Sequence, residues 1–474
     1  MAETHAEPEH MSDFEALMWT LEQNPALSNT FANVTILDQP PDRSHLVAKM
    51  QVAISKVPKL HQRPEEPPNR QGTPVWADDP GFDLAHHLRW VNLGGDATER
   101  DLYDYVAMLA AQPFDRERPL WDFTVVEGLL EGKAAMVQRM HHTITDGEGG
   151  IRLSVAFLDL EREPQTEPDS GAPVAPDGAA GSTTAQPDPQ PRAVGDFLGS
   201  LGDSVRRRGM QVVDAIGVAG SFLRNPGDAA ELARSTGRQA QAMTRCSPLW
   251  TERSLQRWFG TTSLDLAEVR EAAGALGGTV NDFFVTGAAD AAGRVHAAHG
   301  SPVGELRISM PVSIRDSRPE GRGDPMAGGN AFALAQVMVP TGSELTVAER
   351  FSETHERLGA SRQDRALNAL GNAAAVINLL PTAALLATGE RATAGIDFAC
   401  SNVRAAPFDL YMGGALLEAN YPVGPLAGTA FNLTTMSYRG MLWLGLHVDT
   451  AAVEDPRELL GAIDASYTAL FAAA

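Results

Sequence analysis

The residues best suited to chemistry are two adjacent histidines, His141 and His142, with Asp146 and Gly147 shortly after them. An imidazole titrates near neutral pH, so its neutral form can take a proton from an alcohol. Asp146 can stiffen the following turn by pairing with a cation or by binding backbone amides. Gly147 allows a sharp bend where a side chain would clash. The pattern predicts a general base at the end of an extended segment, residues 134–139.

Metal binding and a structural role are the alternative interpretations of this histidine pair. A metal ion needs several convergent ligands, whereas successive side chains of a strand point to opposite faces. If His141 and His142 continue the strand, they cannot easily bind one ion, and we expect no metal. A second pair, His86-His87, lacks such surroundings. We expect that pair to be structural or to lie on the surface.

The elements that must position these residues read as mixed α and β structure. Two segments, 98–109 and 346–358, begin with the Thr-x-x-acid spacing of a capping box and continue with apolar residues at helical spacing. Apolar and polar residues alternate over 306–314, as in a strand. Residues 431–449 form two apolar runs around Arg439-Gly440, which predicts a β-hairpin.

A proline-rich stretch divides the chain. Residues 161–192 contain seven prolines and few apolar side chains, so they cannot offset their ordering entropy and should form a flexible linker. The linker separates an N-terminal subdomain, 11–160, from a C-terminal subdomain, 245–474. Between them, 193–244 has the spacing of an amphipathic helical segment. That segment is either a helical hairpin packed on the body or a helix that contacts anionic lipid.

Composition excludes several classes of protein. The chain has 474 residues, 43% of them hydrophobic, and a formal net charge of -22. Such acidity argues against non-specific nucleic-acid binding. The two cysteines, Cys246 and Cys400, are far apart in sequence, so no disulfide framework is expected and a reducing cytoplasm fits. Neither cysteine lies in a sequence motif typical of a nucleophile. The first ten residues lack the basic and apolar regions of a signal peptide.

One uncharged segment, 366–389, raises the question of a membrane. A span needs about 20 predominantly apolar residues, and this segment qualifies only by its length, because it contains three asparagines and a proline. A buried core helix is the favoured interpretation. The lining of a lipid-binding cavity and a membrane-facing surface are the alternatives.

The histidine motif resembles the HHxxxDG signature of coenzyme-A-dependent acyltransferases. Further matches narrow the resemblance to bacterial wax ester synthase/diacylglycerol acyltransferases; they are Pro119-Leu120-Trp121, Asn281-Asp282, 310–315, 329–330, 401–403 and 421–438. The similarity runs from about residue 79 to the C-terminus and excludes the linker. The family's Pro-Met-His-like element is replaced here by Asn-Pro-Ala-Leu at 24–27.

The resemblance implies an α/β fold of two chloramphenicol-acetyltransferase-like subdomains with mixed sheets. They would be related by pseudo-twofold symmetry and would enclose a central tunnel. Acyl-CoA would enter this tunnel from one side and a hydroxyl acceptor from the other. The division at 161–192 agrees with this picture independently.

The resemblance also assigns roles to the residues of the motif. His142 becomes the general base, and His141 has a smaller role or acts through folding. Asp146 becomes a structural anchor beside Gly147, and Arg315 is the arginine with which we expect it to pair. No cofactor is implied, because acyl-CoA is a co-substrate.

The tetrahedral intermediate of acyl transfer carries a negative oxygen that needs a hydrogen-bond donor. The candidate donors are Asn281, Asn402, Thr434 and Ser437. For Asn281, a helix N-cap is the alternative role.

The family's Pro-Leu-Trp element predicts that Pro119, Leu120 and Trp121 shape the tunnel wall, although Trp121 can equally be plain core. Coenzyme A carries phosphates, so a local basic patch is required on this acidic protein. The candidates for that patch are Arg253, Arg257 and Lys133.

The expected function is transfer of a long-chain acyl group from CoA to a lipid alcohol, giving triacylglycerol from diacylglycerol or wax ester from a fatty alcohol. One alternative is an acyltransferase with another hydroxyl or amine acceptor or a carrier-protein thioester. Another is a non-catalytic lipid-binding homologue. We expect a cytoplasmic protein, with peripheral contact to the inner membrane or to lipid droplets as an option.

Overall fold

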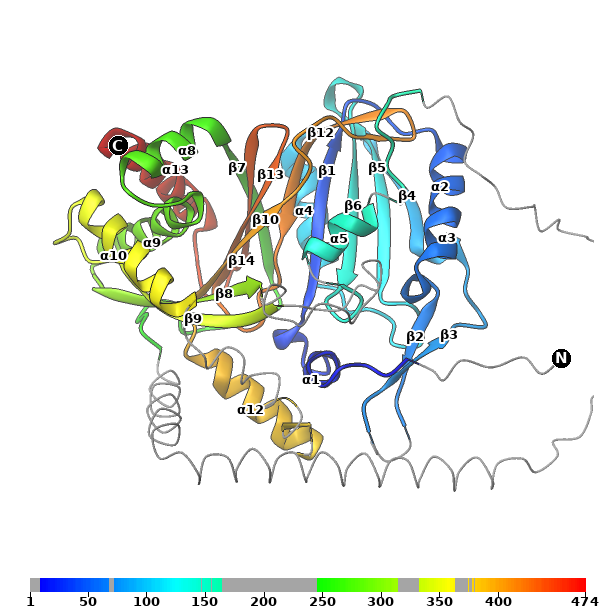
Figure 1. Cartoon of the computed structure of the whole chain (residues 1–474), viewed down its shortest axis with the longest axis horizontal. Coiled ribbons are helices and arrows are strands. Elements are labelled where there is room, and N and C mark those ends of the chain that lie inside the picture. The colour runs from blue at the N-terminus through cyan, green and yellow to red at the C-terminus, as the bar shows by residue number, and fades with distance from the viewer. Residues whose placement is uncertain are drawn as a thin grey trace, which may run out of the picture.

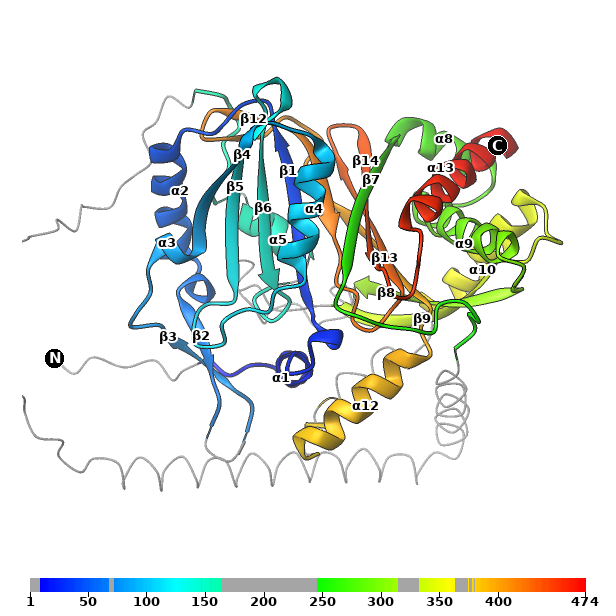
Figure 2. The same cartoon turned by 180° about the vertical axis from the view of Figure 1, so that it is seen from behind.

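The computed structural model describes residues 9–67, 72–145, 147–154, 156–163, 245–313, 332–362, 374, 377–378 and 380–474. Two six-stranded mixed sheets stand side by side and form the two halves of the molecule (Figure 1; Figure 2 shows the reverse side). The expected α/β fold class, with two parts and mixed sheets, is therefore confirmed.

The first sheet has the strand order β11-β12-β1-β6-β5-β4. Its strands are β1 (Thr30–Leu37), β4 (Leu88–Ala97), β5 (Trp121–Leu129), β6 (Ala134–His141), β11 (Tyr411–Met412) and β12 (Ala415–Val423). Only β4 and β5 pair in parallel. The helices α4 (Glu99–Ala110) and α5 (Gly147–Ser154) cover opposite faces of this sheet (Figures 1 and 2).

The second sheet has the order β7-β14-β13-β10-β8-β9. Its strands are β7 (Arg257–Asp265), β8 (Glu305–Ser313), β9 (Phe332–Pro340), β10 (Phe398–Arg404), β13 (Phe431–Tyr438) and β14 (Met441–Asp449). One face is covered by α8 (Leu266–Ala275), α9 (Val280–Ala298), α10 (Val347–Arg362) and α13 (Pro456–Ala473) (Figure 1). Buried side chains of these helices and of the sheet form one core.

Smaller elements surround the first sheet. They are α1 (Asp13–Leu21), α2 (Arg43–Lys56), α3 (Leu84–His87), the short helices η1 (Pro25–Leu27), η2 (Pro58–Leu60) and η4 (Leu130–Gly132), and the hairpin of β2 (Gln62–Glu65) and β3 (Val75–Asp78). Beyond residue 163, the predicted linker and the segment 193–244 lie outside the described residues.

The local signals of the sequence are confirmed where the structure describes them. Thr98 and Asp101 form the capping box of α4, and Thr346 bonds with Glu349 at the start of α10. The alternating segment is β8, and β13 and β14 form the predicted hairpin. Its turn residues have positive φ, 50° and 79°, as a tight hairpin requires.

Strand β12 joins the two halves. Residues 411–423 follow the linker in sequence, yet they complete the first sheet, so the subdomain predicted over 245–474 shares two strands with its partner. β12 also crosses closely over β14: a Cβ on Gly445 would lie 1.8 Å from the carbonyl oxygen of Pro422. Glycine at this position allows the two halves to approach at the backbone level.

The helix α12 (Thr382–Ala394) includes the described end of the uncharged segment 366–389. It lies on the surface beside α1 with Leu385 as its buried residue, so this part is not a core helix. Among the described residues, no helix is both long enough and apolar enough to span a bilayer.

A buried histidine should make the fold sensitive to acid. His447 of β14 lies 2.8 Å from the carbonyl oxygen of Gly424 through Nδ1, and burial lowers its pKa to about 4. The unfolded chain binds a proton near pH 6.5, so the stability provided by neutral His447 is lost as pH falls from about 6.5 towards 4, by about 3 kcal/mol in full. We expect His447→Gln to flatten the dependence of the unfolding free energy on pH in this window. An unchanged slope in urea denaturation would contradict that role.

Candidate active site

The histidine motif lies in a strand–turn–helix unit. β6 ends at His141, residues 142–145 form the turn, and α5 begins at Gly147. His141 is thus the last residue of the strand and His142 the first residue of the turn, so the two histidines do not continue one strand. Their side chains have different surroundings.

His141 is a fully engaged, buried residue. It is 1% exposed. Its Nδ1 accepts the backbone N–H of Thr143 at 3.2 Å and lies 2.7 Å from the Thr143 hydroxyl. Nε2 therefore carries the ring proton and donates to the Glu22 carboxylate at 3.1 Å. With both nitrogens occupied inside the protein, His141 is suited to hold the turn rather than to exchange protons with a substrate.

Glu22 is a site residue that sequence reasoning missed. It follows α1, and its carboxylate accepts bonds from the Ser28 hydroxyl at 2.7 Å, the Asn29 N–H at 2.7 Å and His141. Burial alone would raise the pKa of Glu22, but the hydrogen bonds that its carboxylate accepts lower that pKa overall. The carbonyl oxygen of Asn29 in turn accepts the backbone N–H of His142 at 3.3 Å. Glu22 thus ties the loop before β1 to both histidines.

We expect Glu22→Gln to lower both turnover and thermal stability. A neutral amide offers one acceptor oxygen where the carboxylate offers two, so a buried donor loses its partner at a cost of about 1–3 kcal/mol. Glu117→Gln is the control, because that side chain is 81% exposed. Equal melting temperatures and equal rates for the two variants would rule out the role of Glu22.

His142 keeps partial exposure at the turn. Its ring lies against Phe31 of β1, with centroids 4.6 Å apart and planes tilted by 41°. Two partly exposed glycines of α5 follow, and a Cβ on Gly150 would meet the Phe31 ring at 3.8 Å. α5 itself lies against β10 of the other half. Phe31 thus lies between the His142 ring and α5, the helix that contacts the second half.

The remaining residues of the motif differ in what the structure describes. Gly147 begins α5. Asp146 and Arg315 lie outside the described residues, so their pairing stays a prediction.

The four candidate donors for the oxyanion do not gather at one point. Asn402 of β10 lies 3.5 Å from Asn281, so the structure brings these two together. Asn281 is not the N-cap of α9, since Thr279 fills that position and Asn281 is the second helical residue. Thr434 and Ser437, three residues apart on β13, point to opposite faces.

Strand alternation shows which face each candidate occupies. Asn402 is two residues after Cys400 on β10, so both side chains are on the same face of the sheet. Cys400 packs in the core that the helices cover. Thr434 lies on the other face, is buried and donates to Asn432 at 2.7 Å. Thr434 therefore belongs to the face that meets β12, whereas Asn402 does not.

Comparison with known proteins shows which protein family the chain belongs to. The family model of the wax ester synthase/diacylglycerol acyltransferase catalytic domain matches residues 11–284, and the model of the family's C-terminal domain matches residues 328–471. A Mycobacterium tuberculosis protein, named as a candidate diacylglycerol O-acyltransferase, is 31% identical over 100% of this chain and 94% of its own length. The chain belongs to the wax ester synthase/diacylglycerol acyltransferase family. Members of this family are acyltransferases.

Two further likenesses concern the fold. The wax ester synthase/diacylglycerol acyltransferase of Marinobacter aquaeolei superposes with a TM-score of 0.62 at 20% identity, covering 97% of this chain and 98% of that one. The first condensation domain of the CDA synthetase gives 0.57 at 15% identity, covering 99% and 96%. Both support the two-part α/β architecture.

The family's Pro-Leu-Trp element leads into β5, and Trp121 is the first residue of that strand. The carbonyl oxygen of Pro119 accepts the Trp121 N–H at 3.0 Å. Leu120 and Trp121 are buried in the core of the first half, and the Trp121 indole donates to the Leu60 carbonyl oxygen at 2.8 Å. This packing favours the core interpretation of Trp121, and a tunnel-lining role for the element stays a prediction.

The second histidine pair, His86-His87, is structural at one position and exposed at the other, as expected. His87 is buried, stacks between Phe82 and Trp121, and its pKa is lowered by burial. His86 is exposed on the surface.

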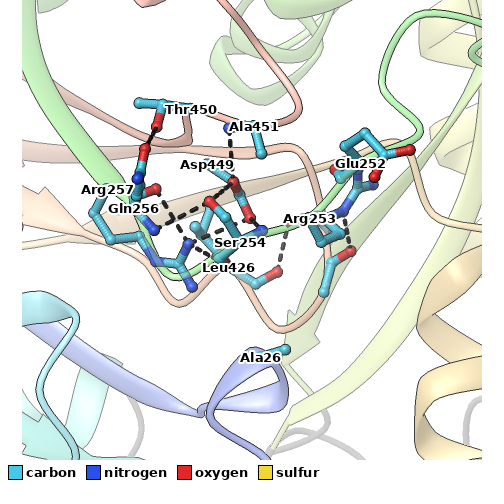
Figure 3. Close-up of polar contacts among 12 residues, drawn as sticks. Ala26, Glu252, Arg253, Ser254, Gln256, Arg257, Leu426, Asp449, Thr450 and Ala451 are labelled. Atoms are coloured by element: carbon cyan, nitrogen blue, oxygen red, sulfur yellow. Dashed lines mark hydrogen bonds and ion pairs between the residues drawn. The ribbon is translucent and has the colours of Figure 1, made fainter.

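The three cations suggested for coenzyme A do not form one patch. Figure 3 shows Arg253 and Arg257 around Ser254 and Asp449. Arg257 is buried and pairs with Asp449 at 3.3 Å, so its charge is compensated. Arg253 donates to three backbone carbonyls, and burial together with the nearby Arg245 lowers its pKa to about 10.

Lys133, the third suggested cation, belongs to the other half. It precedes β6 and pairs with Glu418 of β12 at 2.8 Å. The residues that bind coenzyme A are therefore not identified by these three.

Proposed function

We propose that this family member transfers a long-chain acyl group from CoA to the hydroxyl of a lipid alcohol, with His142 as the general base. The observation that carries the proposal is the position of His142 within a family match that covers most of the chain. The residue is partly exposed, and its ring lies against Phe31. Both ring nitrogens of His141 are engaged inside the protein.

The proposed reaction needs no covalent enzyme intermediate. Neutral His142 takes the proton from the acceptor hydroxyl as the oxygen attacks the thioester carbonyl. The tetrahedral intermediate collapses with loss of the CoA thiolate, and His142 returns the proton to the sulfur. The products are an ester and free CoA, and the histidine is neutral again.

The proposed acceptors are diacylglycerol and fatty alcohols. The Mycobacterium tuberculosis relative is named for diacylglycerol, and the family for both reactions. Such acceptors partition into membranes and lipid droplets, so we expect the enzyme to work at their surface. A donor bound as a carrier-protein thioester, or an amine acceptor, would use the same base.

The test is thiol release from palmitoyl-CoA by the purified full chain with separate acceptors. Release that depends on hexadecanol or diolein supports the proposal. Release only with another acceptor or donor would replace the lipid alcohol but keep the acyltransferase. Tight binding of palmitoyl-CoA without release for any acceptor would identify a non-catalytic homologue.

A further inference from the structure

A strip of polar side chains crosses the first sheet on the face that carries the His142 ring. It consists of Asn33 on β1, Gln138 on β6 and Asn420 on β12. Asn33 stands directly opposite Gln138 in the strand register, and Asn420 opposite Thr35. Alternation places Asn33 on the same face as Phe31, the ring that contacts His142. We call these three amides the amide strip.

The amide strip lies in the middle of the sheet, and Gln138 is buried there whereas the other two amides are not. β1 and β12 each have strands on both sides. Ala32 and Val34, which alternate with Asn33 on β1, are 4% and 0% exposed. Asn33 and Asn420 nevertheless stay partly exposed, as do Phe31 and His142. This face therefore keeps partly exposed positions at Phe31, Asn33 and Asn420, although Met136 and Met140 on the same face are buried in a core. The opposite face is filled by apolar packing against α4.

The amides have more hydrogen-bonding capacity than their neighbours satisfy. The Asn420 carbonyl oxygen accepts the Thr35 hydroxyl at 2.9 Å and also the Asn33 amide. The Asn33 carbonyl oxygen is buried and has no hydrogen-bond partner among the described residues. A buried acceptor without a partner costs stability, so such a group calls for an explanation.

Two of the amide donors point at sulfur, which is a weak acceptor. The Asn420 amide nitrogen lies 3.2 Å from the Met436 sulfur, and the Gln138 nitrogen lies 3.9 Å from the Met136 sulfur. An oxygen of a ligand would be a better partner for both donors. Met436 belongs to β13, so the strip also reaches the second half.

We propose that the amide strip is an acceptor subsite that binds a second oxygen of the acceptor, next to the hydroxyl that reacts. This inference rests on the proposed function and specifies its substrate class: glycerolipids with ester oxygens, such as diacylglycerol, rather than unsubstituted long-chain alcohols. Asn33 lies roughly 7 Å along β1 from Phe31. The ester carbonyl of diacylglycerol is only a few bonds from its free hydroxyl, so it reaches the strip when the hydroxyl is at His142.

A fatty alcohol has no second oxygen near its hydroxyl. It would cover the amides with methylene groups and leave them without partners. Sites that hydrogen-bond a substrate group reject analogues without it for this reason. The amide strip thus favours the glycerolipid and disfavours the alcohol through the same side chains.

The experiment measures kcat/KM for diolein and hexadecanol, with palmitoyl-CoA as the donor, in mixed micelles. We expect the wild type to prefer diolein. Asn33→Leu and Asn420→Leu keep the approximate volume but remove the hydrogen-bonding groups, and each should lower the diolein-to-hexadecanol ratio about tenfold. Asn92→Leu, an exposed amide on the edge strand β4, is the matched control and should leave the ratio unchanged.

A ratio unchanged in both variants, or a wild type that prefers hexadecanol, would overturn the subsite. An equal fall for both acceptors would also overturn it, because that result indicates a structural role. If a leucine variant does not fold, Gln138→Met, which is close to isosteric, gives the same comparison. A wild type without thiol release for either acceptor would instead refute the proposed function itself.

Discussion

Replacing His142 by alanine should lower the rate of acyl transfer by about 10²–10⁴-fold while leaving the melting temperature close to that of the wild type. The rate falls because no neutral imidazole remains to take the hydroxyl proton. Stability should change little because the residue is partly exposed and lies in the turn after β6. Steady-state thiol release and thermal denaturation measure the two effects separately.

The neighbouring histidine provides the contrast. His141→Ala leaves the Glu22 carboxylate and the Thr143 N–H without their partner in a buried site, so we expect a lower melting temperature and a smaller loss of rate per folded molecule. His86→Ala, at an exposed position, should change neither. Full activity of His142→Ala would exclude this residue as the base.

The second large effect is expected at the buried ion pair between Arg139 and Asp122. The guanidinium donates to the two carboxylate oxygens at 2.9 and 2.7 Å, and both side chains are buried. It also binds the carbonyl oxygens of Leu109 and Gln112 at the end of α4. Arg139→Met should therefore destabilise the fold by about 3–5 kcal/mol, because it leaves the buried Asp122 carboxylate without this partner.

Urea denaturation measures the free energy of unfolding of Arg139→Met, which we compare with that of two other variants. Arg100→Met removes a partly exposed arginine that pairs with the exposed Asp104 on the same helix, and it should cost less than about 1 kcal/mol. The double variant Arg139→Met/Asp122→Leu should recover part of the lost stability, since no unpaired charge remains. If Arg139→Met and Arg100→Met lowered the free energy of unfolding by similar amounts, the buried pair would contribute no more to stability than the partly exposed one.

Much of the local structure could be predicted from the sequence, because its causes are local. The capping boxes at Thr98 and Thr346, and the hairpin around Arg439-Gly440, depend on residues within a few positions of one another. The position of the histidine motif at the end of the extended segment 134–139 was also predicted from neighbouring residues, although the strand ends at His141 and does not include His142. The family resemblance then supplied the two-part architecture.

Long-range pairing could not be predicted in this way. The alternation of β12 resembles that of any strand, and nothing local indicates that it leaves its own half to pair with β1. Glu22 and His141 are 119 positions apart, so their bond has no spacing signal. Asn281 was a reasonable N-cap by residue type, but Thr279 with Asp282 forms the complete capping box and takes the position.

The central claim is direct transfer of an acyl group to a lipid hydroxyl with His142 as the base. Mass spectrometry of the lipids formed by the purified chain from palmitoyl-CoA and diolein tests it most directly. We predict one palmitoylated triacylglycerol for each CoA released by the wild type, and at least a hundredfold less product with His142→Ala. Equal product from both proteins, or CoA release without any acylated lipid, would contradict the account.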